Sequence, residues 1–156
     1  METVHPRVLG YLGRALSLEL SAVQQYMTQA SLLALWGDAA SADRFRQETV
    51  EEMQHAERLV QQMLRLGVAP AASQLKPVST ARDLIGLLRL NIVLEDELIQ
   101  HYAEANRFCL LVGDQANAQF FHDLWQEEAQ HGEELEAWVQ DLAGLERSRS
   151  SQRVTF

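Results

Sequence analysis

Two Glu-x-x-His motifs are the residues of this sequence best able to do chemistry. Glu52 and His55 form the first motif, and Glu128 and His131 form the second. Residues three apart on a helix lie on the same side of it, so both side chains of a motif can reach one metal ion. One such motif alone is more often part of an exposed acidic helix. Two of them favour a metal site.

A single further Glu precedes each motif by the same distance. Glu19 lies 33 residues before Glu52, and Glu95 lies 33 residues before Glu128. Four carboxylates converging in an apolar interior repel one another, and two divalent cations would supply the compensating charge. Four oxygen donors and two nitrogen donors suit iron or manganese, whereas structural zinc more often has a closed tetrahedral set with thiolates. The sequence therefore predicts a dinuclear site, with iron as the leading choice.

The segments that must position these residues have the apolar period of helices. Each predicted ligand lies on the apolar stripe of its segment, together with residues such as Tyr26, Phe45, Tyr102 and Phe121. Gly followed by Asp, at 37–38 and at 113–114, predicts two short turns between helices. The predicted helices cover residues 6–36, about 39–66, about 80–112 with a capping box of Thr80 and Asp83, and about 115–142.

An internal repeat relates the two halves of the chain. A shift of 76 residues superimposes Glu19 on Glu95, and the Glu-Glu-x-x-His motif of the first half on that of the second. Residues 67–80 contain two of the three prolines and form the one long connection. We therefore expect an all-α fold, a four-helix bundle made of two hairpins with a long crossover between the second and third helices. Residues 1–145 would form this domain, and residues 146–156 a short C-terminal helix or a tail.

Composition supports one acidic helical domain. The chain has 156 residues, of which 47% are hydrophobic and 22% charged, and its net charge is −9. This charge argues against a general nucleic-acid surface and favours attraction of cations. The single Cys109 cannot form an internal disulfide and is expected as a small buried hydrophobe. Without a signal-like start or a long apolar run, the sequence predicts a cytoplasmic protein with no membrane partner.

The motifs also resemble a known family over roughly residues 5–145. Five stretches resemble the bacterioferritins, which belong to the ferritin-like superfamily: LSLELSAVQQYM at 16–27, WGD at 36–38, ETVEEMQHAER at 48–58, VLEDE at 93–97 and EEAQH at 127–131. The resemblance implies iron storage: a ferroxidase centre that oxidises Fe(II) with dioxygen or hydrogen peroxide, and a homo-oligomeric shell of 24 subunits, built from dimers, that holds Fe(III) mineral. It also implies a ferredoxin as a candidate partner for iron release. The implied iron ligands are the six residues already singled out, Glu19, Glu52, His55, Glu95, Glu128 and His131.

The bridging ligands, one tyrosine and one methionine are given more specific roles. By the symmetry of the repeat, Glu52 and Glu128 are expected to bridge the two metals. Tyr26 lies two turns beyond Glu19, and the resemblance implies an electron donor or a hydrogen-bond partner there. Met53 lies 100° around the helix from Glu52, off the core stripe. The resemblance implies that Met53 binds the iron of haem b, one Met from each of two subunits, and an ordinary interface Met is the alternative.

One departure from the family pattern and two competing functions remain. The family often carries a His and an acidic residue on the inner surface, where this chain has Gln47 and Glu51, and Gln47 is a poorer iron ligand. Glu48 and Glu51 could relay iron, although an exposed acidic helix face explains them more simply. A non-storing oxidase or peroxidase of the rubrerythrin-like type is the alternative function, but no Cys-x-x-Cys pair is present for its electron-transfer iron. A metal-free assembly module would leave six buried ligands unsatisfied.

Overall fold

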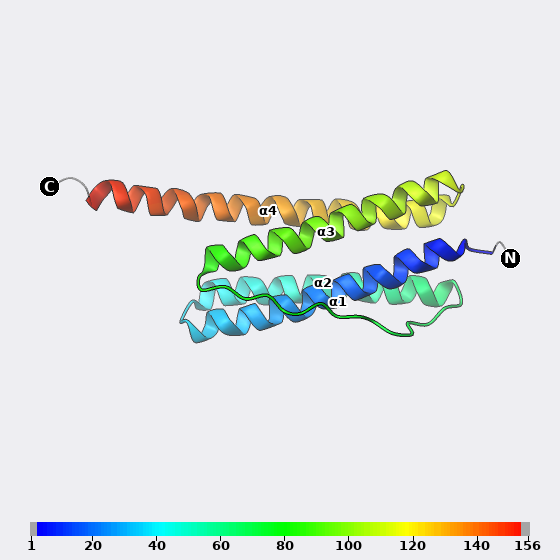
Figure 1. Cartoon of the computed structure of the whole chain (residues 1–156), viewed down its shortest axis with the longest axis horizontal. Coiled ribbons are helices and arrows are strands. Elements are labelled where there is room, and N and C mark those ends of the chain that lie inside the picture. The colour runs from blue at the N-terminus through cyan, green and yellow to red at the C-terminus, as the bar shows by residue number, and fades with distance from the viewer. Residues whose placement is uncertain (1–2, 154–156) are drawn as a thin grey trace.

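The computed structural model describes residues 3–153, which form four long α-helices and no strand (Figure 1). This agrees with the predicted all-α bundle. The helices are α1 (Pro6–Leu35), α2 (Ala39–Arg65), α3 (Leu84–Leu111) and α4 (Gln115–Arg153). None of these helices, over the described residues, combines the length and the apolar character needed to cross a membrane.

Helices α1 and α2 form one antiparallel hairpin, and α3 and α4 form the other (Figure 1). The two hairpin turns are built alike. Gly37 and Gly113 adopt φ values of 83° and 78°, which only glycine adopts without strain, and so end α1 and α3. The next residue then caps the following helix: the Asp38 side chain accepts a hydrogen bond from the Ser41 amide at 3.1 Å. Both predicted turns are therefore confirmed.

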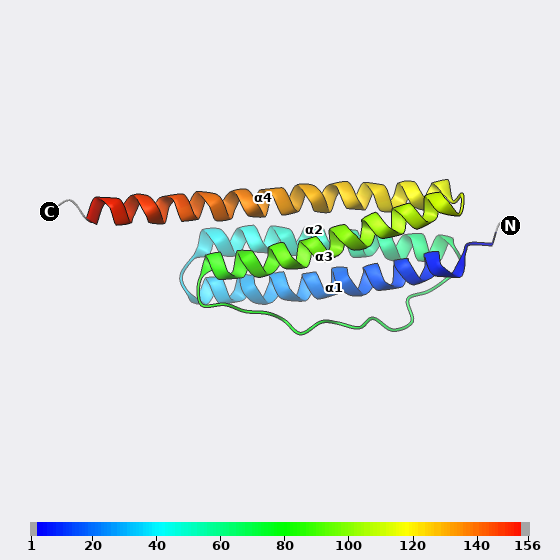
Figure 2. The same cartoon turned by 45° about the horizontal axis from the view of Figure 1, so that its top comes forward.

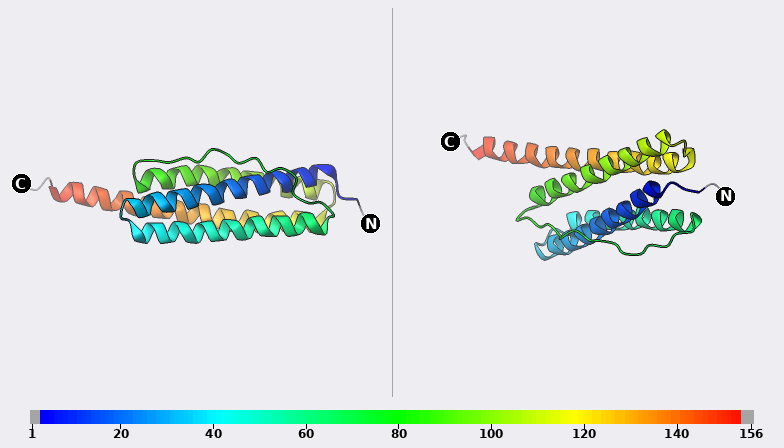
Figure 3. Two further views of the ribbon diagram at one scale, coloured as in Figure 1. Left: turned by 90° about the horizontal axis from the view of Figure 1, so that it is seen from below. Right: turned by 45° about the vertical axis from the view of Figure 1, so that its right-hand side comes forward.

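The long connection between α2 and α3 runs along the outside of the bundle beside α1 (Figures 2 and 3). Side chains of α1 hold its backbone. The Lys76 amide donates to Ser21 Oγ at 2.9 Å, and the Ser79 amide donates to Gln25 Oε1 at 3.2 Å. These contacts satisfy backbone groups of a segment that has no regular secondary structure, and they attach the crossover to the first hairpin.

The boundaries of α3 and α4 differ from the prediction. Asp83, not Thr80, caps α3, because its carboxylate accepts from the Gly86 amide at 2.7 Å and the helix begins at Leu84. The capping box with Thr80 was wrong. Helix α4 does not end near Leu142 but continues to Arg153, and its last turns project beyond the other helices (Figure 1). Residues 146–153 are thus helical and continuous with α4, while residues 154–156 of the expected tail lie outside the described residues.

The core lies where the apolar stripes of the helices meet. Its largest fully buried side chains include Tyr26, Phe45, Tyr102 and Phe121, and Cys109 is buried as expected. A second layer of buried polar groups joins α1 to α3. Gln25 donates to Asn91 at 2.8 Å, and Asn91 donates to Gln29 at 2.7 Å. The bundle interior thus contains polar side chains that the apolar pattern alone did not predict.

Candidate metal centre

Each helix places one carboxylate at the centre of the bundle, and all four side chains are fully buried. The helices α2 and α4 each add one histidine, one turn after the Glu of the motif. His55 is 6% exposed and His131 is 8% exposed, whereas the four Glu are 0% exposed. All six predicted ligands are therefore brought together: Glu19, Glu52, His55, Glu95, Glu128 and His131.

The six residues divide into two overlapping sets, each able to hold one metal ion. Within a set, one ligand atom of every residue lies within 4.8 Å of the others. The first set is Glu19, Glu52, His55 and Glu128, and the second is Glu52, Glu95, Glu128 and His131. Because Glu52 and Glu128 belong to both sets, their carboxylates lie between two adjacent metal positions. This is the arrangement expected if these two residues bridge the metals.

Each histidine contacts a carboxylate of the other hairpin. His55 Nδ1 on α2 lies 2.8 Å from Glu128 Oε1 on α4, and His131 Nδ1 on α4 lies 3.0 Å from Glu52 Oε1 on α2. The two imidazole ring centroids are 6.3 Å apart. The centre therefore exists only when the two hairpins pack together, and both Nδ1 atoms face the carboxylates.

Two buried tyrosines hold the remaining carboxylates in the same crossed manner. Tyr26 on α1 donates to Glu95 on α3 at 2.8 Å, and Tyr102 on α3 donates to Glu19 on α1 at 2.6 Å. Burial raises the pKa of both phenols well above 10, and the charge of the nearest Glu raises it further. The hydroxyls therefore keep their protons and act as donors. Tyr26 is on the same helix as Glu19, but its hydroxyl contacts Glu95 of the other hairpin.

The carboxylates do not share one protonation state. Burial raises the pKa of Glu52 and of Glu128 well above 4.5, and the charge of Glu19 raises both further. Burial also raises the pKa of Glu95. Burial works in the same direction on Glu19, but hydrogen bonds from Glu52, His55 and Glu128 outweigh it and lower its pKa to about 2. In the metal-free protein, protons thus offset part of the repulsion among four buried carboxylates.

The two histidines are cationic in the metal-free protein. Burial lowers the pKa of His55, but hydrogen bonds with Glu19 and Glu52 outweigh it and raise the pKa to about 10. Burial likewise acts against protonation of His131, and Glu48 and Glu52 raise its pKa to about 12. Each imidazolium therefore stands where a cation is favoured by the surrounding carboxylates, and a metal ion at Nδ1 would replace its proton.

Buried oxygens without partners show that protein groups alone do not complete the cluster. Among residues 3–153, the Oε2 atoms of Glu19, Glu95 and Glu128, and that of Glu48 outside the ligand set, are buried and accept no hydrogen bond. A buried acceptor left unpaired is unfavourable and rare in folded proteins. Two divalent ions would supply partners for the oxygens of the ligand set and four positive charges, so the donor set fits a dinuclear centre of iron or manganese.

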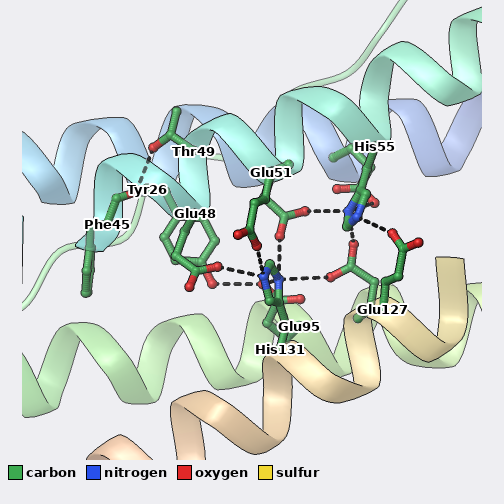
Figure 4. A network of polar contacts seen from close by, with 12 residues as sticks. Tyr26, Phe45, Glu48, Thr49, Glu51, His55, Glu95, Glu127 and His131 are labelled. Carbon is green, nitrogen blue, oxygen red and sulfur yellow. Dashed lines mark hydrogen bonds and ion pairs between the residues drawn. The ribbon is translucent and has the colours of Figure 1, made fainter. Parts of the chain in front are cut away.

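The sequence did not predict which residues contact the outer nitrogens of the histidines (Figure 4). Glu127 Oε2 lies 2.8 Å from His55 Nε2, and Glu51 is hydrogen-bonded to His131 Nε2. Glu48 Oε2 lies 2.9 Å from the same nitrogen of His131. The duplicated Glu-Glu-x-x-His pattern carried this signal, because the first Glu of each motif is repeated as faithfully as the second.

A surface pocket of about 450 Å³ reaches both histidines between α2 and α4. Its lining is polar: Glu51, Gln54, His55, Arg58, Glu127, Gln130, His131 and Glu134. Gln47 is exposed and lines a neighbouring pocket with Glu51, so the structure places it outside the cluster. The pocket gives ions or small molecules access to the two histidines.

Met53 lies apart from this centre, on the outer surface of the bundle. Its side chain is 53% exposed, and the apolar side chains of Met27 and Trp36 are 53% and 42% exposed. The structure therefore agrees with Met53 lying outside the core.

Comparison with known proteins identifies the family. The sequence profile described as the ferritin-like domain matches residues 9–145. A bacterioferritin of Brucella melitensis is 31% identical over 94% of this chain and 91% of its own, and one of Rhodobacter capsulatus is 31% identical over 85% and 83%.

The fold agrees with these sequence matches. The 2.6 Å structure of Rhodobacter capsulatus bacterioferritin, described with a metal-free dinuclear site and heme iron in a crystallographic special position, superimposes with a TM-score of 0.88 at 29% identity, covering 92% of this chain and 89% of that one. The chain therefore belongs to the bacterioferritin family of ferritin-like proteins.

Proposed function

We propose that this chain is an iron-storing ferroxidase that oxidises Fe(II) at the six-residue cluster and deposits Fe(III) mineral inside a homo-oligomeric cage. The observation that carries the proposal is the set of buried carboxylate oxygens without partners, on Glu19, Glu95 and Glu128, in a chain of bacterioferritin fold. Such a cluster is unfavourable by itself and becomes favourable when cations enter. Fe(II) is here both the ion that completes the site and the substrate.

The residues divide the work at the centre by position. Glu52 and Glu128 would be shared by both iron ions, Glu19 and Glu95 would each hold one, and each imidazole would offer Nδ1. Two Fe(II) ions give up one electron each, and these two electrons with two protons reduce dioxygen to hydrogen peroxide, or hydrogen peroxide to two waters. The closed ligand set holds both ions at once, so that the oxidant meets two electron donors together.

Tyr26 and Tyr102 position the terminal ligands. Each phenol donates a short hydrogen bond to one oxygen of Glu95 or Glu19, which leaves the other oxygen for iron. The role of Tyr26 as an electron donor stays a prediction from the family resemblance. The exposed acidic residues around the pocket between α2 and α4 give Fe(II) a favourable approach to the histidines. Since Gln47 offers no carboxylate or imidazole, we assign iron transfer on this face to Glu48 and Glu51 instead.

Met53 is proposed as the axial ligand of haem b between two subunits. Met27 of α1 and Trp36, which caps α1, are likewise exposed apolar side chains, and such side chains suit contact with a flat apolar ring or with a second copy of the chain. The Rhodobacter capsulatus relative contains heme iron in a special position, which supports a shared haem. A reduced-minus-oxidised absorption spectrum of the purified protein tests this, because bis-methionine haem loses its low-spin spectrum in Met53→Ala while the assembly remains.

The finer points of assembly and physiology stay predictions. These are a shell of 24 subunits built from dimers, the choice between dioxygen and hydrogen peroxide, release of iron through a ferredoxin, and a cytoplasmic location. Light scattering of the purified protein tests the first directly. With a chain mass of 17.7 kDa, a shell of 24 subunits differs greatly from a dimer.

The experiment that tests the function is an anaerobic Fe(II) titration followed by oxygen, read by Fe(III) absorbance. We expect a fast oxidation phase that saturates at two iron ions per chain, then slower uptake of several hundred ions into a large particle. Glu128→Ala should lose the fast phase, because it removes a carboxylate shared by both metal positions. A fast phase without later uptake would favour the non-storing oxidase, and absence of any fast phase would contradict the proposed centre.

A further inference from the structure

Two carboxylates outside the ligand set each contact the outward nitrogen of one ligand histidine. Glu127 on α4 contacts His55 Nε2 of α2 at 2.8 Å, and Glu51 on α2 is hydrogen-bonded to His131 Nε2 of α4 (Figure 4). Each of these Glu directly precedes a ligand Glu in the sequence. The first Glu of each Glu-Glu-x-x-His motif therefore reaches across to the histidine of the other motif.

We propose that Glu127 and Glu51 are positioning residues that hold the two histidines for metal binding, an inference that rests on the proposed function. Once a metal ion displaces the Nδ1 proton, an imidazole that donates its Nε2 proton to a carboxylate keeps the lone pair on Nδ1, and its ring cannot rotate freely. Nδ1 is the nitrogen that faces the cluster in both rings, 2.8 Å from Glu128 for His55 and 3.0 Å from Glu52 for His131. The crossed contacts thus present both lone pairs to the metal positions.

The two contacts differ in what supports them. The same Glu127 oxygen that accepts from His55 also lies 2.7 Å from Arg58 Nη1, and Arg58 follows His55 by three residues on α2. A charge-assisted pair of this geometry holds the carboxylate in place even though Glu127 is half exposed. The outer nitrogen Nε2 of His55 therefore has one acceptor, Glu127, and an arginine on the same helix as His55 holds that carboxylate in place.

His131 has a second carboxylate close to its outer nitrogen instead of an arginine. No Lys or Arg of residues 3–153 pairs with Glu51, but Glu48 Oε2 lies 2.9 Å from the same His131 Nε2. If Glu51 is removed, Glu48 can accept the proton in its place. If Glu127 is removed, His55 has no such replacement among the described residues, so the two positions should respond unequally.

The test is a Co(II) titration of the metal-free assembled protein, read by the d–d absorption bands and by calorimetry. Co(II) is stable in air, so its binding reports the ligand geometry without turnover. We expect Glu127→Ala to weaken one of two binding steps by about 10–100-fold and to alter the bands of that step. Glu51→Ala should weaken Co(II) binding less than Glu127→Ala does. The double variant Glu48→Ala with Glu51→Ala should weaken it more than Glu51→Ala alone.

Glu127→Gln separates positioning from charge, since its amide oxygen can still accept from His55 Nε2. It should recover most of the affinity and the parental bands, and because it preserves the shape of the side chain it also serves if Glu127→Ala folds poorly. Glu133→Ala, which removes an exposed carboxylate from the same helix, is the matched control and should bind Co(II) as the parent does.

Three results would decide against the inference. Parental affinity and bands in Glu127→Ala would overturn it, and so would a Glu127→Gln variant as weak as Glu127→Ala, because N–H acceptance would then not be the role. If the parent itself does not bind two Co(II) per chain, the proposed dinuclear centre fails and the inference fails with it. The first two results leave the proposed function intact.

Discussion

Two polar clusters lie buried in this bundle, and only one of them is complete without a ligand. In the amide cluster, defined as Gln25, Gln29, Asn91 and the backbone of Ser79, each side chain both donates and accepts. Gln29 donates to the Ser79 carbonyl at 2.8 Å, and the Ser79 amide donates to Gln25 at 3.2 Å, which closes the chain of hydrogen bonds. In the carboxylate cluster, formed by the six predicted ligands, three buried oxygens accept no hydrogen bond within residues 3–153.

The difference distinguishes buried polar groups that stabilise the fold from buried polar groups that bind a ligand. Gln25, Gln29 and Asn91 are at most 6% exposed, as buried as the ligand residues, yet they are neutral and each of their polar side-chain atoms has a hydrogen-bond partner. The carboxylates carry like charge, and part of their hydrogen-bonding capacity is unused. Buried groups of the first kind stabilise a fold, whereas groups of the second kind cost stability until cations bind. Burial alone therefore does not identify a site, but burial with unmet acceptors does.

The largest effect on the oxidation rate should come from removing a shared carboxylate. Glu128→Gln keeps the size of the side chain and removes one of the charges between the two metal positions. We expect the fast phase of Fe(II) oxidation to fall by about 100-fold or more, which corresponds to about 3 kcal/mol in the barrier. The metal-free variant should unfold at the same or a higher temperature than the parent, because a buried repulsion is gone. A metal-free variant with a lower melting temperature would contradict this account of the cluster.

Metal binding should stabilise the carboxylate cluster and thereby the whole fold. At a free Co(II) concentration of about 1,000 times Kd, the expected gain is about 4 kcal/mol, or roughly 8–16 °C in Tm for a chain of this size. Differential scanning calorimetry with and without Co(II) measures it. The same scan on Glu128→Gln is the control, and an equal upward shift in that variant would place the stabilising ion elsewhere.

Disrupting the amide cluster should affect stability and leave chemistry alone. Asn91→Ala removes the acceptor of Gln25 and the donor to Gln29, so two buried groups lose their partners. We expect a loss of about 2–4 kcal/mol in the free energy of unfolding, measured by denaturant titration of the metal-free protein. The rate of the fast Fe(II) oxidation phase at 25 °C should stay at the parental value. A slowed fast phase in a folded variant would show that the two clusters are coupled.

Metal affinity should rise with pH between 6 and 8. The pKa of His55 is raised to about 10 and that of His131 to about 12, so both imidazoles carry a proton in this range that the metal must displace. Each proton released strengthens binding tenfold, or about 1.4 kcal/mol, per unit of rising pH, and the gain ends as pH passes the histidine pKa. Calorimetry in buffers of different ionisation enthalpy counts the protons. A metal affinity that does not change with pH would mean that the histidines are already neutral.

The smallest effect should come from the phenol that holds Glu19. Tyr102→Phe removes the 2.6 Å hydrogen bond to the Glu19 carboxylate and keeps the aromatic ring. We expect a loss of about 1–2 kcal/mol, seen as weaker Co(II) binding rather than as loss of the fast oxidation phase. The paired variant Tyr26→Phe, which frees Glu95, is the control. If the repeat is functionally symmetric, the two variants should match.

Much of the centre was predictable because its residues obey local rules. The helical period, the equal 33-residue spacings and the 76-residue repeat place all six ligands on core stripes, and the structure brings them together. Glu127 and Arg58 were not predicted, since an exposed Glu and an exposed Arg are ordinary on an acidic helix. The crossed contacts of Tyr26 and Tyr102 also escaped prediction, because periodicity gives the face of a helix but not which neighbour that face meets.

Local sequence was sufficient for the number and approximate positions of the helices, for the two Gly-Asp turns and for the helix face on which each candidate ligand lies, because these depend on contacts within a few residues and on a period of 3.6. Tertiary packing decided the rest. It decided which histidine meets which carboxylate, which oxygens stay unpaired and hence how each pKa shifts, and that Asn91 completes a chain of amides rather than a metal site. These outcomes depend on distances of 2.6–3.0 Å between residues far apart in sequence, and only the docking of the two hairpins sets such distances.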